Sequence, residues 1–317
     1  MSASGGTRAV LAALLANTGI AATKFLAWLL TGSSAMLAEA VHSVADAGNQ
    51  GLLLLGGRRA RRQATPLHPF GFGRERYIYA FIVSIVLFSV GGLFALYEAW
   101  HKLSDPHAIT SWHWVPVTVL VAAIGMESIS LRTAIVESNL IRGTTSWVQF
   151  VRRARAPELP VVLLEDIGAL VGLIFALIGV GLTLITGDGI WDAVGTAMIG
   201  LLLVSIAVVL AIETKSLLLG EAATADDQAA IETALTGGDG VERIIHMKTL
   251  HLGPDELLVA AKIAVAPGVA AGQLAETINA AEARIRSAVP IARVIYLEPD
   301  VYAAATPEAE PRVRRGT

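Results

Sequence analysis

Six long apolar stretches dominate the sequence, at 8–30, 33–55, 77–100, 113–136, 160–186 and 190–212. Each is longer than the roughly 20 residues that a helix needs to cross the core of a bilayer. Lipid cannot satisfy backbone polar groups, and no strand-like alternation indicates a barrel, so we predict six transmembrane helices. The apolar fraction of 54% and the charged fraction of 16% agree with a membrane protein, and they exclude a disordered or nucleic-acid-binding chain.

Arginines are concentrated in two of the connections between these stretches. The connection after the second stretch contains Arg58, Arg59, Arg61, Arg62, Arg74 and Arg76, and the one after the fourth contains Arg142, Arg152, Arg153 and Arg155. Short basic loops stay on the cytoplasmic side of a membrane. We therefore predict a multi-pass protein of the cytoplasmic membrane with both termini in the cytoplasm.

The sequence changes character after residue 213, where polar residues and turn signals become frequent. Its patterns predict, in order, a helix at Ala222–Leu235, strands at Val241–Leu252 and Glu256–Val265, a helix at Ala270–Val289 and a strand at Ile291–Leu297. The predicted regions are a transmembrane domain at 1–213, a small cytoplasmic α+β domain of order αββαβ at 214–303 and a disordered tail at 304–317. So small a domain would gain stability from a second copy.

Two ionisable residues of the second stretch form the first candidate for a metal site. His42 and Asp46 stand four residues apart, a spacing that places both on one face of a helix. An ionisable group at bilayer depth costs at least ~2.5–3.5 kcal/mol unless it has a partner or a polar cavity. The chain has no cysteine, so any metal must bind nitrogen and oxygen. The alternative is a pair that only holds helices together.

The fifth stretch adds two adjacent acids, Glu165 and Asp166, within an apolar run. Neighbouring residues point about 100° apart around a helix, so both cannot face one site directly. We predict that one of them binds an ion and the other assists. Metal and protons compete for imidazole and carboxylate groups, so such a site suits exchange of metal for protons.

Other polar residues of the apolar stretches are predicted to have structural roles. Asn17, Lys24, Glu127 and Asp192 are expected to pair between helices or to lie near a membrane surface. The long side chain of Lys24 can also extend toward the headgroups.

Three segments resemble the cation diffusion facilitator family. They are TGSSAMLAEAVHSVAD at 31–46, PFGFGRERYIYAF at 69–81 and KSLLLGEA at 215–222. The resemblance implies a homodimeric exporter of zinc or related divalent ions that exchanges them for protons. It also implies a ferredoxin-like cytoplasmic domain that helps the protein to dimerise and can sense metal.

The resemblance also assigns roles to individual residues. His42 and Asp46 match the metal-binding pair of the family's second span, and Glu165 is the favoured third ligand, with Asp166 as alternative or assistant. The fifth span departs from the commoner pattern of two ligands four residues apart, because Ala169 follows Glu165 at that distance. The sequence Leu-Leu-Glu-Asp at 163–166 is similar to that of the branch of the family that contains zinc transporter 9.

The resemblance makes a further metal site in the soluble tail possible, formed by His246 with Glu298 or Asp300. The alternative is that these are ordinary surface residues. His246 and His251 are separated by an odd number of residues, so they are predicted to face opposite sides of a sheet.

The predicted cargo is zinc, with manganese, iron, cobalt or nickel as further divalent candidates. No cofactor is predicted, and the expected partners are the metal ion, protons, the lipid bilayer and a second copy of the chain. An intramembrane metal enzyme is disfavoured, because the sequence contains no His-Glu-x-x-His motif. A membrane scaffold or metal-sensing regulator that does not transport remains the alternative.

Overall fold

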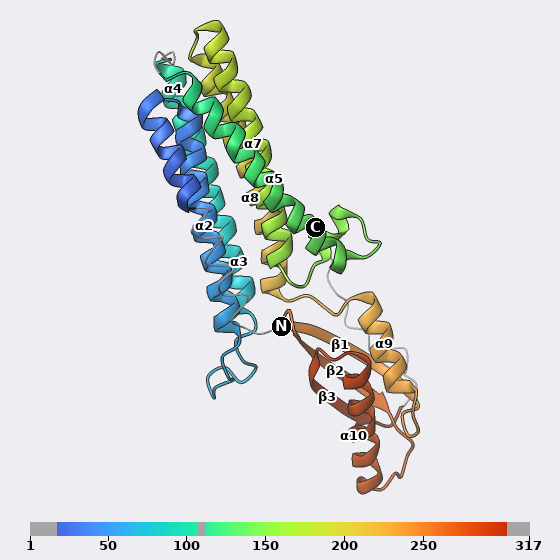
Figure 1. Cartoon of the computed structure of the whole chain (residues 1–317). Coiled ribbons are helices and arrows are strands. Elements are labelled where there is room, and N and C mark those ends of the chain that lie inside the picture. The colour runs from blue at the N-terminus through green and yellow to red at the C-terminus, as the bar shows by residue number, and fades with distance from the viewer. Residues whose placement is uncertain (1–17, 107–111, 303–317) are drawn as a thin grey trace, which may run out of the picture. The chain divides into compact units, whose positions relative to one another are not determined.

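The structure is a computed structural model that describes residues 18–106 and 112–302 (Figure 1). The chain divides into two compact units between Leu219 and Gly220. The predicted boundary after residue 213 falls inside a helix that continues to Leu219, and Gly220 follows with a φ of +105°. Asn17, the start of the first predicted span and the predicted disordered tail at 304–317 lie outside the described residues.

The first unit is helical, as predicted. Its described helices are Thr18–Thr31, α2 (Ser34–Ala60), α3 (Glu75–Val86), α4 (Phe94–Ser104), α5 (Trp114–Arg142), α6 (Trp147–Arg153), α7 (Glu158–Thr186) and α8 (Ile190–Leu219). The short helix α6 was not predicted, because the residues between the fourth and fifth stretches were interpreted only as a basic connection.

Four helical segments of the described residues are long and apolar enough to cross a membrane. They are Glu75–Ser104, Trp114–Arg142, Glu158–Thr186 and Ile190–Leu219. The helix Thr18–Thr31 is apolar but shorter. Helix α2 has 27 residues, but it includes Glu39, Asp46 and two arginines near its end, which lower its hydropathy. Length and composition alone therefore support four of the six predicted spans.

Close backbone contact joins α7 to α8, which pack along each other (Figure 1). A Cβ atom at Gly179 would lie 2.8 Å from the carbonyl oxygen of Trp191, and one at Gly195 would lie 2.9 Å from the carbonyl oxygen of Phe175. Small residues at such crossings are typical of helices that associate in lipid, where packing rather than hydrophobic burial drives association. The two glycines therefore fix how α7 lies against α8.

A π-helical segment, η1 (Leu87–Leu93), joins α3 to α4 within one continuous helix. It contains Gly91 and Gly92, and a Cβ atom at Gly92 would lie 2.6 Å from the Cγ2 atom of Val204 on α8. Short π segments inside α-helices are frequent at functional sites. The apolar pattern predicted only a plain helix here.

Asp192, near the start of α8, binds the beginning of α2. Its fully buried carboxylate accepts hydrogen bonds from the backbone N–H groups of Ser34 and Ala35 and from the hydroxyl groups of Ser33 and Ser34, at 2.7–3.4 Å. A negative charge is favourable at this end of a helix, where N–H groups lack intrahelical partners. The expected pairing of Asp192 between helices is therefore confirmed.

The second unit has the predicted order αββαβ. Its elements are α9 (Ala225–Thr236), β1 (Arg243–Gly253), β2 (Glu256–Ala264), α10 (Ala271–Ala288) and β3 (Ala292–Asp300). Strand β2 is central, antiparallel to β1 and parallel to β3. Apolar residues that alternate along the strands form one core with the two helices, including Ile231, Leu257 and Ile285.

Candidate metal site

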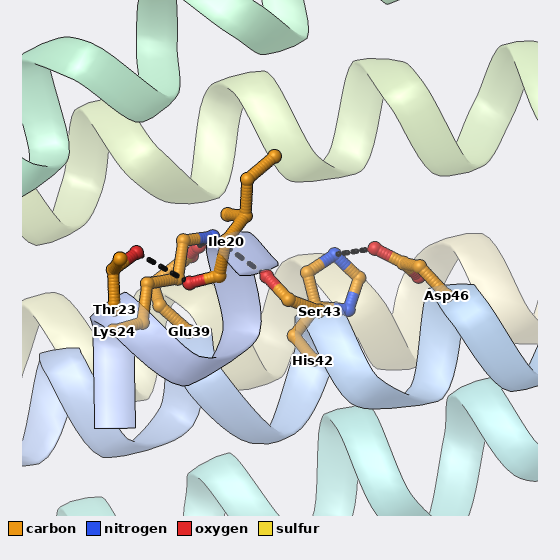
Figure 2. A network of polar contacts seen from close by, with 7 residues as sticks. All are labelled: Ile20, Thr23, Lys24, Glu39, His42, Ser43 and Asp46. Carbon is orange, nitrogen blue, oxygen red and sulfur yellow. Dashed lines mark hydrogen bonds and ion pairs between the residues drawn. The ribbon is translucent and has the colours of Figure 1, made fainter. Parts of the chain in front are cut away.

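His42 and Asp46 meet on one face of α2, as their spacing predicts. The His42 Nε2 atom lies 3.4 Å from the Asp46 Oδ2 atom, and the His42 side chain is only 1% exposed (Figure 2). Neither ring nitrogen of His42 nor the Asp46 Oδ1 atom has a hydrogen-bond partner among the described residues. Buried polar atoms are nearly always satisfied, so unsatisfied atoms of residue types that bind metals make this pair a candidate site.

The π segment lies beside this pair. A Cβ atom at Gly91 would lie 3.9 Å from the His42 Nδ1 atom and 3.2 Å from a methyl carbon of Leu203 on α8. A side chain at position 91 would therefore crowd Leu203, and it would also contact the imidazole at an ordinary distance. Because residue 91 is glycine, the η1 backbone rather than a side chain lies beside the imidazole at this point.

Glu165 and Asp166 on α7 are both buried, and they face different helices. The Asn49 Nδ2 atom on α2 donates a hydrogen bond of 2.7 Å to Glu165. The Ser130 hydroxyl on α5 donates one of 3.0 Å to Asp166. This divergence is the one expected of adjacent helical residues. Glu165 therefore lies on the side of α7 that faces α2, where His42 and Asp46 are.

The predicted residues do not form a complete set of metal ligands. No group of three His, Asp or Glu side chains among the described residues lies close enough together to hold an ion. The carboxylates of Asp46 and Glu165 are near enough for their charges to interact. Like charges repel, and a cation between them would offset that repulsion. His42 and Asp46 are in contact on α2, and a hydrogen bond from Asn49 holds Glu165 on the side of α7 that faces α2.

Comparison with known proteins identifies the family. The cation efflux transmembrane domain matches residues 10–219, about two thirds of the chain. The chain belongs to the cation efflux family. This confirms the predicted relationship to cation diffusion facilitators, and similarity to SLC30A9 proteins confirms the branch that contains zinc transporter 9.

Three relatives of this cation efflux protein show the extent of the similarity. "Proton-coupled zinc antiporter SLC30A9, mitochondrial" of Mus musculus is 34% identical over 233 residues, which cover 73% of this chain and 41% of that protein. The Xenopus laevis protein of the same name is 33% identical, covering 76% and 43%. "Metal tolerance protein C4" of Arabidopsis thaliana is 28% identical, covering 81% and 56%. The chain thus matches about two fifths of the SLC30A9 proteins' length.

The partner of Lys24 was not predicted from the sequence. The Lys24 ammonium lies 3.0 Å from the Glu39 Oε2 atom and 2.8 Å from the Ser43 hydroxyl oxygen (Figure 2). Lys24 is only 1% exposed, so its predicted extension toward the headgroups is wrong, and the alternative of pairing between helices is confirmed. The available signal was a lysine in one apolar stretch and a glutamate in the next.

The two histidines of β1 face opposite sides of the sheet, as predicted. His251 is buried, whereas His246 is exposed and pairs in register with Lys262 on β2, which pairs with Glu298 on β3. The Lys262 ammonium lies 3.2 Å from Glu298 and 2.9 Å from Asp300. It therefore already binds the two acids that the sequence analysis combined with His246, which favours the interpretation of ordinary surface residues.

Lys262 and Asp300 stabilise each other's charged forms. Hydrogen bonds, first to Asp300 and then to Glu298, raise the pKa of Lys262, and the bond from Lys262 lowers the pKa of Asp300. A lowered acid pKa adds stability above the acid's unfolded pKa, and a raised lysine pKa adds stability below the lysine's unfolded pKa. We expect the pair to stabilise the second unit between about pH 4 and pH 10, and less outside those limits.

Replacing Lys262 by methionine should raise the pKa of Asp300 toward its ordinary value of about 3.9. Carboxyl NMR titration of the full chain measures this change directly. Lys248→Met, which removes an exposed lysine from β1, is the control and should leave the Asp300 pKa low. An Asp300 pKa that is the same in the wild type and in Lys262→Met would contradict the assignment.

Proposed function

We propose that this cation efflux protein exports divalent metal ions, with zinc as the favoured cargo, in exchange for protons. The observation that carries the proposal is the pair of buried His42 and partly buried Asp46, in which both ring nitrogens and the Asp46 Oδ1 atom lack a hydrogen-bond partner among the described residues. An imidazole with carboxylates suits ions of borderline character such as zinc, and manganese, iron, cobalt and nickel are the further candidates. The name of the mouse relative describes zinc and proton coupling for that protein, and its similarity here supports the same cargo.

Glu165 is the proposed third ligand, and Asp166 the assisting acid. The support is that Asn49 ties Glu165 to the helix that bears His42 and Asp46, whereas Asp166 binds Ser130 on α5. Three protein ligands leave a coordination position open, as suits a site that must release its ion. Metal binds only the deprotonated ligands, so protons that enter the site favour metal release, and alternating exposure of the site would couple the two flows.

The proposed topology has six spans, with α2 as the second. Its 27 residues extend about 40 Å, enough to cross a hydrocarbon core of about 30 Å. Its polar residues Glu39, His42 and Asn49 are buried, so they do not face lipid. The basic connections after α2 and α5 support cytoplasmic termini, and we propose the cytoplasmic membrane as the location.

We propose that the working protein is a homodimer with a ferredoxin-like cytoplasmic domain. The second unit has the element order of such a domain and a small core. Small domains of this kind gain stability by packing against another copy. Tyr296, on the central part of β3, is 58% exposed and offers an apolar surface for that contact.

A scaffold or metal-sensing regulator without transport is the second candidate. It is favoured by the absence of a three-residue ligand group among the described residues, and by Ala169 at the position four residues after Glu165. Such a protein could bind an ion weakly without carrying it across the membrane. Such a protein would have the fold of the family but would not transport metal ions.

Transport by the purified full chain in proteoliposomes separates these candidates. Zinc, manganese, iron, cobalt and nickel are supplied one at a time with an imposed pH gradient, while metal and proton movements are recorded. An exporter moves metal in one direction and protons in the other. Folded protein that moves neither under any of these conditions would support the scaffold and contradict our proposal.

Replacing His42 by aspartate should shift ion preference from zinc toward manganese by at least about tenfold, because an oxygen ligand replaces nitrogen. Competition between the two ions in the same vesicles measures the ratio. His68→Asp makes the same chemical change in the connection between α2 and α3 and should leave the ratio unchanged. An unaltered ratio in His42→Asp would mean that the imidazole does not bind the ion.

A further inference from the structure

The buried ammonium of Lys24 lies close to the proposed metal site. It is anchored by Glu39 and Ser43, and Ser43 is the residue that follows His42 on α2. Asp46 is three positions after Ser43, or roughly 4.5 Å farther along the helix axis. Figure 2 shows Lys24, Ser43, His42 and Asp46 in succession along the same side of α2. The positive charge is therefore held by the residue that follows His42 on α2.

Lys24 is also the only buried Lys or Arg among the residues that the structure describes. The acids whose charges interact with Lys24 are Glu39 and Asp46 on α2 and Glu127 on α5. The Lys24 ammonium is near enough to Asp46 for their charges to interact. This ammonium thus places a positive charge among carboxylates that would otherwise attract cations more strongly.

The second carboxylate oxygen of Glu39, which does not bind Lys24, faces α7. Its Oε1 atom has no hydrogen-bond partner among the described residues, and a Cβ atom at Gly172 on α7 would lie 3.0 Å from it. One oxygen of the carboxylate thus binds Lys24, and the other lies beside Gly172, where α7 has no side chain. Within the described part of the chain, the cation that pairs with Glu39 is Lys24.

We propose that Lys24 is a tethered cation that sets the affinity of the metal site, by repelling the divalent ion that His42 and Asp46 bind. The inference rests on the proposed function, because it requires metal at that pair. Two positive charges at short range in a medium less polar than water repel each other strongly. A site that must release its cargo works with moderate affinity, and the fixed ammonium keeps affinity moderate without removing any ligand.

The inference predicts opposite effects for the two members of the ion pair. Lys24→Met keeps the length of the side chain and removes its charge, so zinc should bind about tenfold more tightly. Glu39→Gln removes the balancing negative charge, so zinc should bind several-fold more weakly. Lys24→Arg keeps the charge and should bind zinc about as the wild type does. A pair that only stabilises the helices would instead weaken zinc binding in both single variants.

The experiment measures the zinc Kd of the detergent-solubilised full chain by competition with a fluorescent chelator at fixed pH. The double variant Lys24→Met/Glu39→Gln is compared with Glu39→Gln alone, so the two proteins differ only in the lysine charge and neither leaves Glu39 unpaired. Zinc should bind the double variant about tenfold more tightly than Glu39→Gln. This comparison remains decisive if Lys24→Met alone does not fold.

His42→Ala separates failure of the inference from failure of the proposed function. If His42→Ala leaves the zinc Kd unchanged, the proposed metal site is wrong and the inference falls with it. If His42→Ala weakens binding while removal of the Lys24 charge changes nothing or weakens it further, the site stands and the role of Lys24 is overturned. Tighter binding on removal of that charge, together with slower zinc release from preloaded vesicles, supports the inference.

Discussion

Replacing His42 or Asp46 by alanine should reduce zinc uptake into inverted vesicles by at least about 100-fold. Each substitution removes one of three proposed protein ligands, and the remaining groups cannot hold a borderline ion in the same geometry. Ser43, the residue that follows His42, already binds Lys24 and so does not replace a lost ligand. Initial uptake rates, normalised to the amount of folded protein, measure the effect.

Two exposed residues provide matched controls for these alanine variants. His101 near the end of α4 and Glu137 on α5 are exposed, and neither is part of the proposed site. Their alanine variants should transport zinc within about twofold of the wild type, because exposed substitutions usually cost little. Wild-type uptake by either His42→Ala or Asp46→Ala would show that the ion binds elsewhere.

The two acids of α7 should differ sharply in their importance. Glu165→Gln should reduce zinc transport by at least about tenfold, because Glu165 is held next to α2 and is the proposed ligand. Asp166→Asn should reduce it less than about threefold, because Asp166 faces Ser130 on α5. Both changes keep the shape of the side chain, so each variant is the control for the other in the same uptake assay.

The opposite order of effects would move the ligand role to Asp166. Equal and complete loss in both variants would mean that α7 presents the two carboxylates to one ion. That result requires α7 to be unwound or rotated from the helix in the structure, where adjacent residues diverge.

Much of the fold could be predicted from the sequence, because long apolar runs and alternating strands are local patterns. The runs predicted the starts of α5, α7 and α8 within two residues but ended α5 and α8 six and seven residues too early, and the alternation predicted the strands β1 to β3. The π segment could not be predicted, because it depends on how Gly91 and Gly92 pack against α8. Such packing involves residues more than 100 positions apart in the chain, which no local pattern contains.

The candidate site shows the same division between local and long-range information. The spacing of His42 and Asp46 predicted their contact, and the adjacency of the two acids on α7 predicted their divergence. The pairing of Lys24 with Glu39 depends on how two helices are rotated against each other. A sequence shows that each charge needs a partner in lipid, but it does not identify that partner.

The carboxylate of Asp192 determines how α2 can move. It holds the first turn of α2 through four hydrogen bonds, so that end follows α8 as a fixed pivot. His42 lies about 12 Å along the axis from Ser34, and Asp46 about 18 Å. A swing of α2 about this pivot would therefore displace Asp46 about one and a half times as far as His42. The His42–Asp46 pair would keep its own geometry, and its position relative to Glu165 on α7 would change.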